Sequence, residues 1–259
     1  MPKMRTLVFG GTFDPPHEGH AALLAAAAES IRPARILVVP AWRARLKSAA
    51  PSAPAAERLA LVELGVVGRL PKRWRRLARV DAGEARAACV VPTVATLSRL
   101  KKARPWEELH FVCGQDAAAS FPRWTSPKKL RVLAHWWYGA RPGAKARPSA
   151  RFRRVPGRFP DISSTELREA LALGRDTPLL HKKVRSRIDA RGLYGGRLLA
   201  RLRETLKAGR FEHTVNVAAL AAALARAHGA DADKALLAGL LHDAGRRFPP
   251  HKLAAYARR

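Results

Sequence analysis

The sequence predicts an α/β protein with a doubly wound parallel sheet, followed by a small all-helical C-terminal region. Short apolar runs alternate with helical stretches along the first part of the 259-residue chain, which is typical of βαβ units. The first run, Leu7–Phe9, leads directly into a glycine turn and a helical segment. Beyond Gly195 and Gly196 the strand pattern stops and only Ala/Leu-rich helical segments remain. We therefore expect domains at residues 1–195 and 196–259.

Each element follows from local periodicity and composition. After Leu7–Phe9, the apolar runs that predict strands are Arg35–Pro40, Leu77–Asp81, Leu109–Gly114 and the aromatic His135–Arg141. Helical spacing is found at Ala21–Ala28, Glu57–Val67 and Thr93–Lys101, and in the tail at Leu198–Leu206, His213–His228 and Asp233–His242. The Pro/Ala/Ser-rich stretch Ala49–Ala56 predicts a loop.

The charge balance is strongly basic, with 49 Lys and Arg against 20 Asp and Glu and a formal net charge of +29. Nucleic-acid binding is one reading of this charge. We favour a compositional reading, because Arg is abundant throughout the chain, with attraction of anionic substrates as a by-product. The two cysteines, Cys89 and Cys113, lack metal-type spacing and suggest a reducing compartment. With no signal peptide and no apolar run of about 20 residues, we expect a cytoplasmic protein without a membrane partner. Nucleic-acid binding stays a third, less favoured hypothesis.

The stretch from Gly10 to His20 carries the first chemical signal. Two adjacent glycines after a strand let the backbone approach a ligand closely, and the following helix N-terminus favours phosphate. His17 and His20 are three residues apart, so they share one face of a helix. Surface histidines or half a zinc site are the alternatives, but the spacing is not His-Glu-x-x-His and no third ligand is nearby in the sequence. The stretch therefore predicts binding of a nucleoside triphosphate.

Gly-Gly-Thr-Phe-Asp-Pro-Pro-His-Glu-Gly-His resembles the signature of the HxGH nucleotidyltransferases, and most closely that of the bacterial nicotinate-nucleotide adenylyltransferases. A second stretch, Asp161–Arg168, resembles the Ile-Ser-Ser-Thr-x-x-Arg motif of the same family. Ser163 and Glu166 have capping-box spacing and predict a helix start; a plain capped helix is the alternative for this stretch alone. The resemblance implies catalytic roles for His17, His20 and Arg168. The resemblance also implies that ATP is accompanied by Mg²⁺. The residues that it implies in binding ATP and its phosphates are Gly10, Gly11, Thr12, Phe13, Lys47, Ser163, Ser164 and Thr165.

Weaker matches concern the acceptor substrate. The resemblance implies mononucleotide contacts by Thr93, Asp116, Trp124 and Arg141, although core packing is the commoner fate of a lone tryptophan. Ala95 stands where the family carries an aspartate. The implied reaction is adenylyl transfer from ATP to nicotinate mononucleotide, giving nicotinate adenine dinucleotide and pyrophosphate in NAD biosynthesis. Nicotinamide mononucleotide and phosphopantetheine are alternative acceptors.

The tail carries a different pattern. Phe211-Glu212-His213 and Leu240-Leu241-His242-Asp243 resemble the start of an HD-type metal phosphohydrolase. The resemblance implies a divalent metal held by His213, His242 and Asp243. The family's distant aspartate has no counterpart before Arg259, so we expect a partial HD segment with an incomplete site. A metal-dependent nucleotide phosphohydrolase is thus the alternative function of another class.

Overall fold

The computed structural model describes residues 4–43, 52–143 and 147–244. The chain divides into two compact units, one of residues 1–164 and 178–187, the other of residues 165–177 and 188–259. Residues 165–177, which the sequence analysis placed in the first domain, are thereby grouped with the tail. The boundary at residue 195 stays a prediction.

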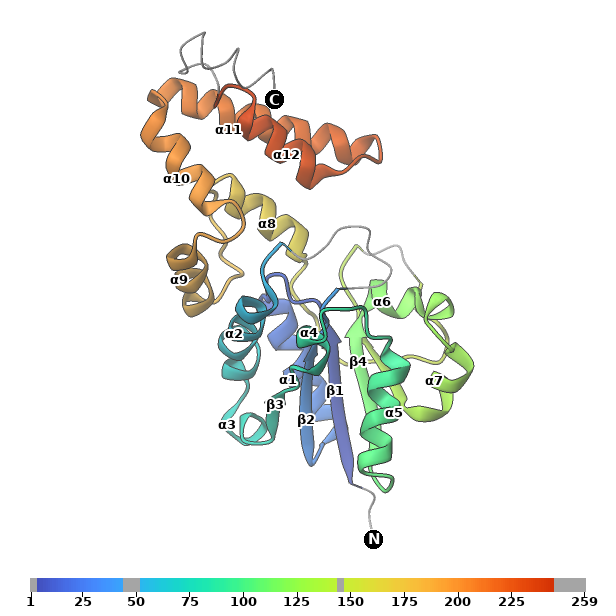
Figure 1. Ribbon diagram of the computed structural model, residues 1–259. Coiled ribbons are helices and arrows are strands. Elements are labelled where there is room, and N and C mark those ends of the chain that lie inside the picture. Colours follow the sequence, from blue (N-terminus) through green and yellow to red (C-terminus); the bar gives the residue numbers. More distant parts are fainter. Residues whose placement is uncertain (1–3, 44–51, 144–146, 245–259) are drawn as a thin grey trace. The chain divides into compact units, whose positions relative to one another are not determined.

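The first unit contains a six-stranded sheet in the order β3-β2-β1-β4-β5-β6, with every neighbouring pair parallel (Figure 1). The strands are β1 (Arg5–Gly11), β2 (Arg35–Pro40), β3 (Ala78–Val80), β4 (Glu108–Gly114), β5 (His135–Gly139) and β6 (Arg153–Arg154). The chain builds outward from β1 in one direction and resumes beside β1 with β4, which is the doubly wound arrangement. The fold class and five strands are confirmed; β6, only two residues long, was not expected.

Helices cover both faces of the sheet because side chains alternate along each strand. Leu7 and Phe9 pack with α1 on one face, whereas Val8 packs with α5 on the other. The helices of this unit are α1 (Glu18–Ile31), α2 (Ala55–Gly65), α3 (Lys72–Arg75), α4 (Gly83–Arg86), α5 (Thr93–Ala103), α6 (Gln115–Ala119) and α7 (Pro127–Leu133), with short 3₁₀ turns η1 (Val67–Arg69) and η2 (Phe121–Arg123). A further helix, α9 (Lys182–Arg191), runs from this unit into the second.

The second unit is helical and contains α8 (Ser164–Ala172) from Thr165 onward, α10 (Gly196–Thr205), α11 (Ala208–Ala227) and α12 (Ala232–Leu241). Its apolar core joins the end of α8 to the three later helices, through Ala172, Leu173, Leu199, Leu202, Ala218, Ala222, Leu236 and Leu240. Gly239 lies so close to α11 that an added Cβ would come 2.4 Å from the Ala218 Cα. Among the described residues, no helix is long and apolar enough to cross a membrane.

The loops after β1 and β2 are held by two buried charged side chains. The Asp14 carboxylate accepts hydrogen bonds from the backbone N–H groups of Ser52, at 2.7 Å, and Ala53, at 3.1 Å. Arg58 on α2 is 1% exposed, and its guanidinium donates to four backbone carbonyls, those of Thr12, Ala41, Trp42 and Ala53. These contacts fix the glycine turn relative to the segment that follows β2.

We expect Arg58→Met to destabilise the protein by about 3 kcal/mol, because one buried and three partly buried carbonyls lose their donor. Urea unfolding followed by circular dichroism measures this loss. Arg69→Met is the matched control, since Arg69 is exposed and its ion pair with Glu18 is long, at 3.6 Å; it should cost about 1 kcal/mol or less. Equal losses in the two variants would contradict a special role for Arg58.

Candidate active site

The two histidines of the first motif meet at the start of α1. His17 is the N-cap residue with an extended backbone (φ −140°, ψ 172°), and His20 lies in the first turn. Their ring centroids are 3.7 Å apart. The His17 backbone N–H donates to His20 Nδ1 at 3.2 Å. Because Nδ1 is the acceptor, the neutral His20 ring carries its proton on Nε2, which can donate to a phosphate oxygen.

Gly19 explains why a glycine separates the histidines. A Cβ at this position would lie 3.0 Å from His17 Nδ1 and 3.1 Å from His17 Cε1. A side chain at position 19 would therefore push the ring of His17, a residue that is 8% exposed, by a few tenths of an ångström. Gly10 and Gly11 also leave room for neighbouring rings, since a Cβ on either would come within 2.8 Å of an aromatic ring.

The next two residues of the first motif, Thr12 and Phe13, contribute mainly their main-chain groups to the site. Thr12 offers its carbonyl to Arg58, as described above. Phe13 is 1% exposed, and its ring packs edge-on against His20 with centroids 5.0 Å apart. A ligand contact by Phe13 would thus involve the main chain. Lys47, the remaining ATP-binding prediction from this part of the chain, lies outside the described residues.

The second motif begins next to the first. Helix α8 starts at Ser164, immediately after Ser163, as the capping-box spacing predicts. The Ser164 hydroxyl donates to the Pro15 carbonyl at 2.9 Å, joining positions 149 residues apart in the sequence. Thr165 and Arg168 belong to the second unit, where Arg168 Nη2 contacts Thr165 Oγ1 at 3.4 Å.

Three of the predicted mononucleotide residues follow strands or begin a helix. Asp116 follows the carboxyl end of β4, and Arg141 follows that of β5. The two side chains lie 3.9 Å apart, and Arg141 also pairs with Asp161 at 3.2 Å. Thr93 is the first residue of α5. The carboxyl ends of β1 and β4, where the strand order reverses, are the usual ligand position in such a sheet.

Trp124 is partly buried and packs against an aromatic cluster. Its ring centroid lies 5.9 Å from that of Phe111 and 5.8 Å from that of Trp136, both edge-on, and its Nε1 donates to Ser120 Oγ at 3.0 Å. The packing alternative therefore has direct support, while stacking on a pyridine ring stays a prediction.

The tail residues His213, His242 and Asp243 come together, with possible ligand atoms within 4.8 Å of one another. His242 Nδ1 lies 2.7 Å from the Gly239 carbonyl, so it donates and leaves Nε2 available to a metal, 3.5 Å from Asp243 Oδ2. This set fits a divalent ion, since ligating histidines usually donate their other nitrogen in this way. Arg210 competes for the same carboxylate, with its Nη1 2.9 Å from Asp243 Oδ2.

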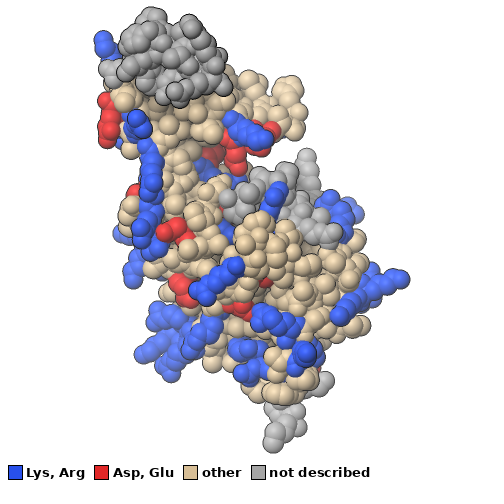
Figure 2. All heavy atoms as spheres, viewed as in Figure 1, with Lys and Arg blue, Asp and Glu red and all other residues tan. Residues whose placement is uncertain are grey.

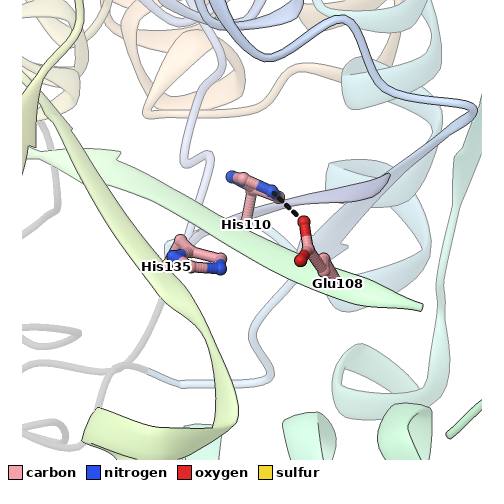
Figure 3. A group of neighbouring side chains, drawn as sticks. All are labelled: Glu108, His110 and His135. Carbon is pink, nitrogen blue, oxygen red and sulfur yellow. Dashed lines mark ion pairs between the residues drawn. The ribbon is translucent and has the colours of Figure 1, made fainter. Parts of the chain in front are cut away.

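Sequence reasoning missed a second cluster (Figure 3). It lies at the amino ends of β4 and β5, opposite the carboxyl ends that carry Asp116 and Arg141. Glu108, His110 and His135 have possible ligand atoms within 4.8 Å of one another. Trp137 Nε1, however, donates to His110 Nδ1 at 3.1 Å, which places the proton of the neutral His110 ring on Nε2. A metal bound at Nε2 would need that proton on Nδ1, facing the indole N–H. The rings of His110 and His135 also stack, 4.8 Å apart and 27° from parallel, so this cluster does not fit a metal.

Basic side chains are spread over the surface. Figure 2 shows Lys and Arg over most of the visible face, with few Asp and Glu among them. Several are engaged in ion pairs, including Arg73 with Glu29 and Arg187 with Glu57. A dispersed distribution accords with a compositional origin of the charge.

The chain belongs to the cytidylyltransferase-like family, whose profile matches residues 8–170. Within that family it is similar to curated bacterial nicotinate-nucleotide adenylyltransferases. It is 34% identical over 200 residues to a probable nicotinate-nucleotide adenylyltransferase of Gloeobacter violaceus, which covers 72% of this chain and 94% of the relative. A protein of the same description from Roseiflexus castenholzii is 32% identical over 203 residues, covering 73% of this chain and 98% of the relative.

Solved structures support the fold. Plasmodium falciparum nicotinic acid mononucleotide adenylyltransferase complexed with NaAD superposes with a TM-score of 0.60 at 19% identity, covering 74% of this chain and 97% of that one.

In the tail, residues 210–258 match the HD-domain profile. Both family resemblances seen in the sequence are thereby confirmed.

The structure predicts a pH dependence of stability that originates at His110. Burial, followed by the nearby His135 and Arg5, lowers the pKa of His110 to about 4, against the partial opposition of Glu108. The unfolded chain, with a histidine pKa of about 6.5, then binds more protons than the folded one between these values. Stability due to this group is complete above about pH 6.5 and is lost as the pH falls towards 4.

We therefore expect the unfolding free energy of the wild type to fall, relative to His110→Gln, by up to about 3 kcal/mol between pH 6.5 and 4. Urea titrations across this range measure the difference. His228→Gln, at an exposed histidine, should leave the wild-type slope intact. Parallel pH profiles for wild type and His110→Gln would contradict the prediction.

Proposed function

We propose that this protein transfers the adenylyl group of ATP to nicotinate mononucleotide, forming nicotinate adenine dinucleotide and pyrophosphate. The observation that carries the proposal is the meeting of the two phosphate motifs, joined by the Ser164 hydroxyl and the Pro15 carbonyl at the start of α1. The similarity to nicotinate-nucleotide adenylyltransferases supports the choice of acceptor.

The reaction would need no covalent enzyme intermediate. A phosphate oxygen of the mononucleotide attacks the α-phosphorus of ATP, and the bond to the β-phosphate oxygen breaks as pyrophosphate leaves. The protein's task is then to position both substrates and to stabilise negative charge. Mg²⁺ accompanying ATP would neutralise part of the charge on the phosphates.

The side chains of the two motifs supply the remaining donors. His20 would donate through Nε2, the nitrogen left with the proton once Nδ1 accepts from the His17 backbone. His17 lies beside it with ring centroids 3.7 Å apart, and α1 adds the N–H groups of its first turn. Ser163, Ser164, Thr165 and Arg168 would bind the phosphates from the start of α8, and Lys47 would join them.

The acceptor would lie at the ends of β4 and β5. Asp116 would hold ribose hydroxyls, while Arg141, Thr93 and Trp124 would contact the phosphate and the pyridine ring. Arg141 is already oriented by its ion pair with Asp161 and by its backbone N–H, which donates to Gln115 Oε1 at 3.0 Å.

The deciding experiment offers nicotinate mononucleotide, nicotinamide mononucleotide and phosphopantetheine in parallel, with ATP and Mg²⁺, and measures pyrophosphate release. We expect nicotinate mononucleotide to be the best acceptor, and His17→Ala to lower kcat/KM at least about 100-fold by removing a donor at the phosphates. A His17→Ala protein with the wild-type rate would refute the proposed site.

Gly19→Ala should separate activity from stability. The added methyl group displaces the His17 ring by a few tenths of an ångström, and misplaced catalytic groups cost about 10- to 100-fold in rate. Alanine favours the helix by up to about 1 kcal/mol, so the unfolding free energy should not fall by much. Gly209→Ala is the matched control: it occupies the same second position in α11, and a Cβ there meets nothing within 4 Å. A fully active Gly19→Ala protein would contradict this account.

A further inference from the structure

The arginine of the second motif is held by an acidic residue of the tail. Arg168 Nη2 lies 3.1 Å from Asp233 Oδ2, with the side chains 17% and 45% exposed. Asp233 stands in the first turn of α12, 65 residues further along the chain. The contact lies within the second unit, so it joins a nucleotidyltransferase motif to the HD-like segment directly.

Helix α8 is also built into the tail by packing. Ala172 and Leu173, at its end, share an apolar core with α10, α11 and α12. A second ion pair joins the next residue on α8, Glu169, to Arg226 of α11. The helix that carries Arg168 is therefore an integral part of the helical tail rather than a free end of the first unit.

We propose that Asp233 competes with the phosphates of ATP for the Arg168 guanidinium and thereby weakens the binding of ATP. This inference rests on the proposed function, in which Arg168 binds those phosphates. The Asp233 carboxylate offsets the charge of the guanidinium and accepts from Nη2, one of the groups that could donate to a phosphate oxygen. Because the phosphates of ATP would compete with Asp233 for this guanidinium, the tail would lower the affinity for ATP.

The size of the expected effect on ATP binding follows from how exposed the Arg168–Asp233 ion pair is. Ion pairs that water can reach contribute up to about 1 kcal/mol, and the upper part of this range, about 0.4 to 1 kcal/mol, corresponds to a two- to five-fold change in an equilibrium constant. Asp233→Asn keeps an oxygen acceptor but removes the charge. We expect it to lower KM for ATP about two- to five-fold at low salt, with kcat and KM for the mononucleotide unchanged. The difference should shrink at 0.5 M salt, where charges are screened within a few ångströms.

Two control variants separate this effect from others. Glu204→Gln removes one negative charge from an exposed position of the same unit and should leave KM for ATP unchanged. Arg226→Gln breaks the neighbouring ion pair of α8 and tests whether loosening the tail is sufficient. It should also leave KM for ATP unchanged. An unchanged or raised KM in Asp233→Asn, or an equal decrease in either control, would overturn the proposal.

Binding measurements distinguish a failure of this inference from a failure of the proposed function. Calorimetric titration with a non-hydrolysable ATP analogue should show the same two- to five-fold tightening in Asp233→Asn, and none when Arg168→Ala is also present. If the wild type and the two variants bind the analogue in this pattern but the wild type transfers no adenylyl group to any acceptor offered, the proposed reaction is wrong and the competition stands. If transfer occurs and Asp233→Asn binds the analogue as the wild type does, the competition is wrong and the reaction stands.

Discussion

The buried Arg58 guanidinium is the constraint on which the candidate site depends. A glycine turn that brings backbone close to a ligand leaves carbonyl groups without regular partners, and these cost free energy when buried. Arg58 donates to the Thr12 carbonyl of this turn and, at the same time, to three other carbonyls, two in the segment after β2 and one at residue 53. A planar group with five donors can do this, and the point charge of a lysine cannot. The turn is thus held in place by α2, a helix outside the motif.

With the turn fixed, the geometry of the histidines follows from local sterics. His17 ends an extended segment and caps α1, and the absence of a side chain at Gly19 leaves room for its ring. The His17 backbone then selects the His20 tautomer that presents an N–H group outward. The His-x-Gly-His spacing is therefore a set of packing requirements as well as a list of reactive groups.

Much of this could be predicted from the sequence, since apolar strand runs and motif spacing are local signals. Five strands, the parallel class and the start of α8 followed from them. Arg58 did not, although a signal existed: it shares a helical face with the buried Leu61 and Val62, three and four residues on, and a charge on an apolar face requires partners. The His110 cluster could not be predicted, because it depends on the register of β4 and β5, which pairs His110 with His135.

The place of α8 is the feature that sequence reasoning represented least well. The predicted boundary after residue 195 places the Ser-Ser-Thr-x-x-Arg helix in the first domain, whereas its last residues are core of the helical tail and its arginine pairs with α12. Motif matching reads each helix against one family at a time, so a helix that serves two families' segments is assigned to only one of them. Packing does not follow the limits of families, since apolar side chains at the end of α8 are buried by whatever residues lie nearest. A change in the tail that shifts α12 would therefore act on Arg168 through its ion pair with Asp233.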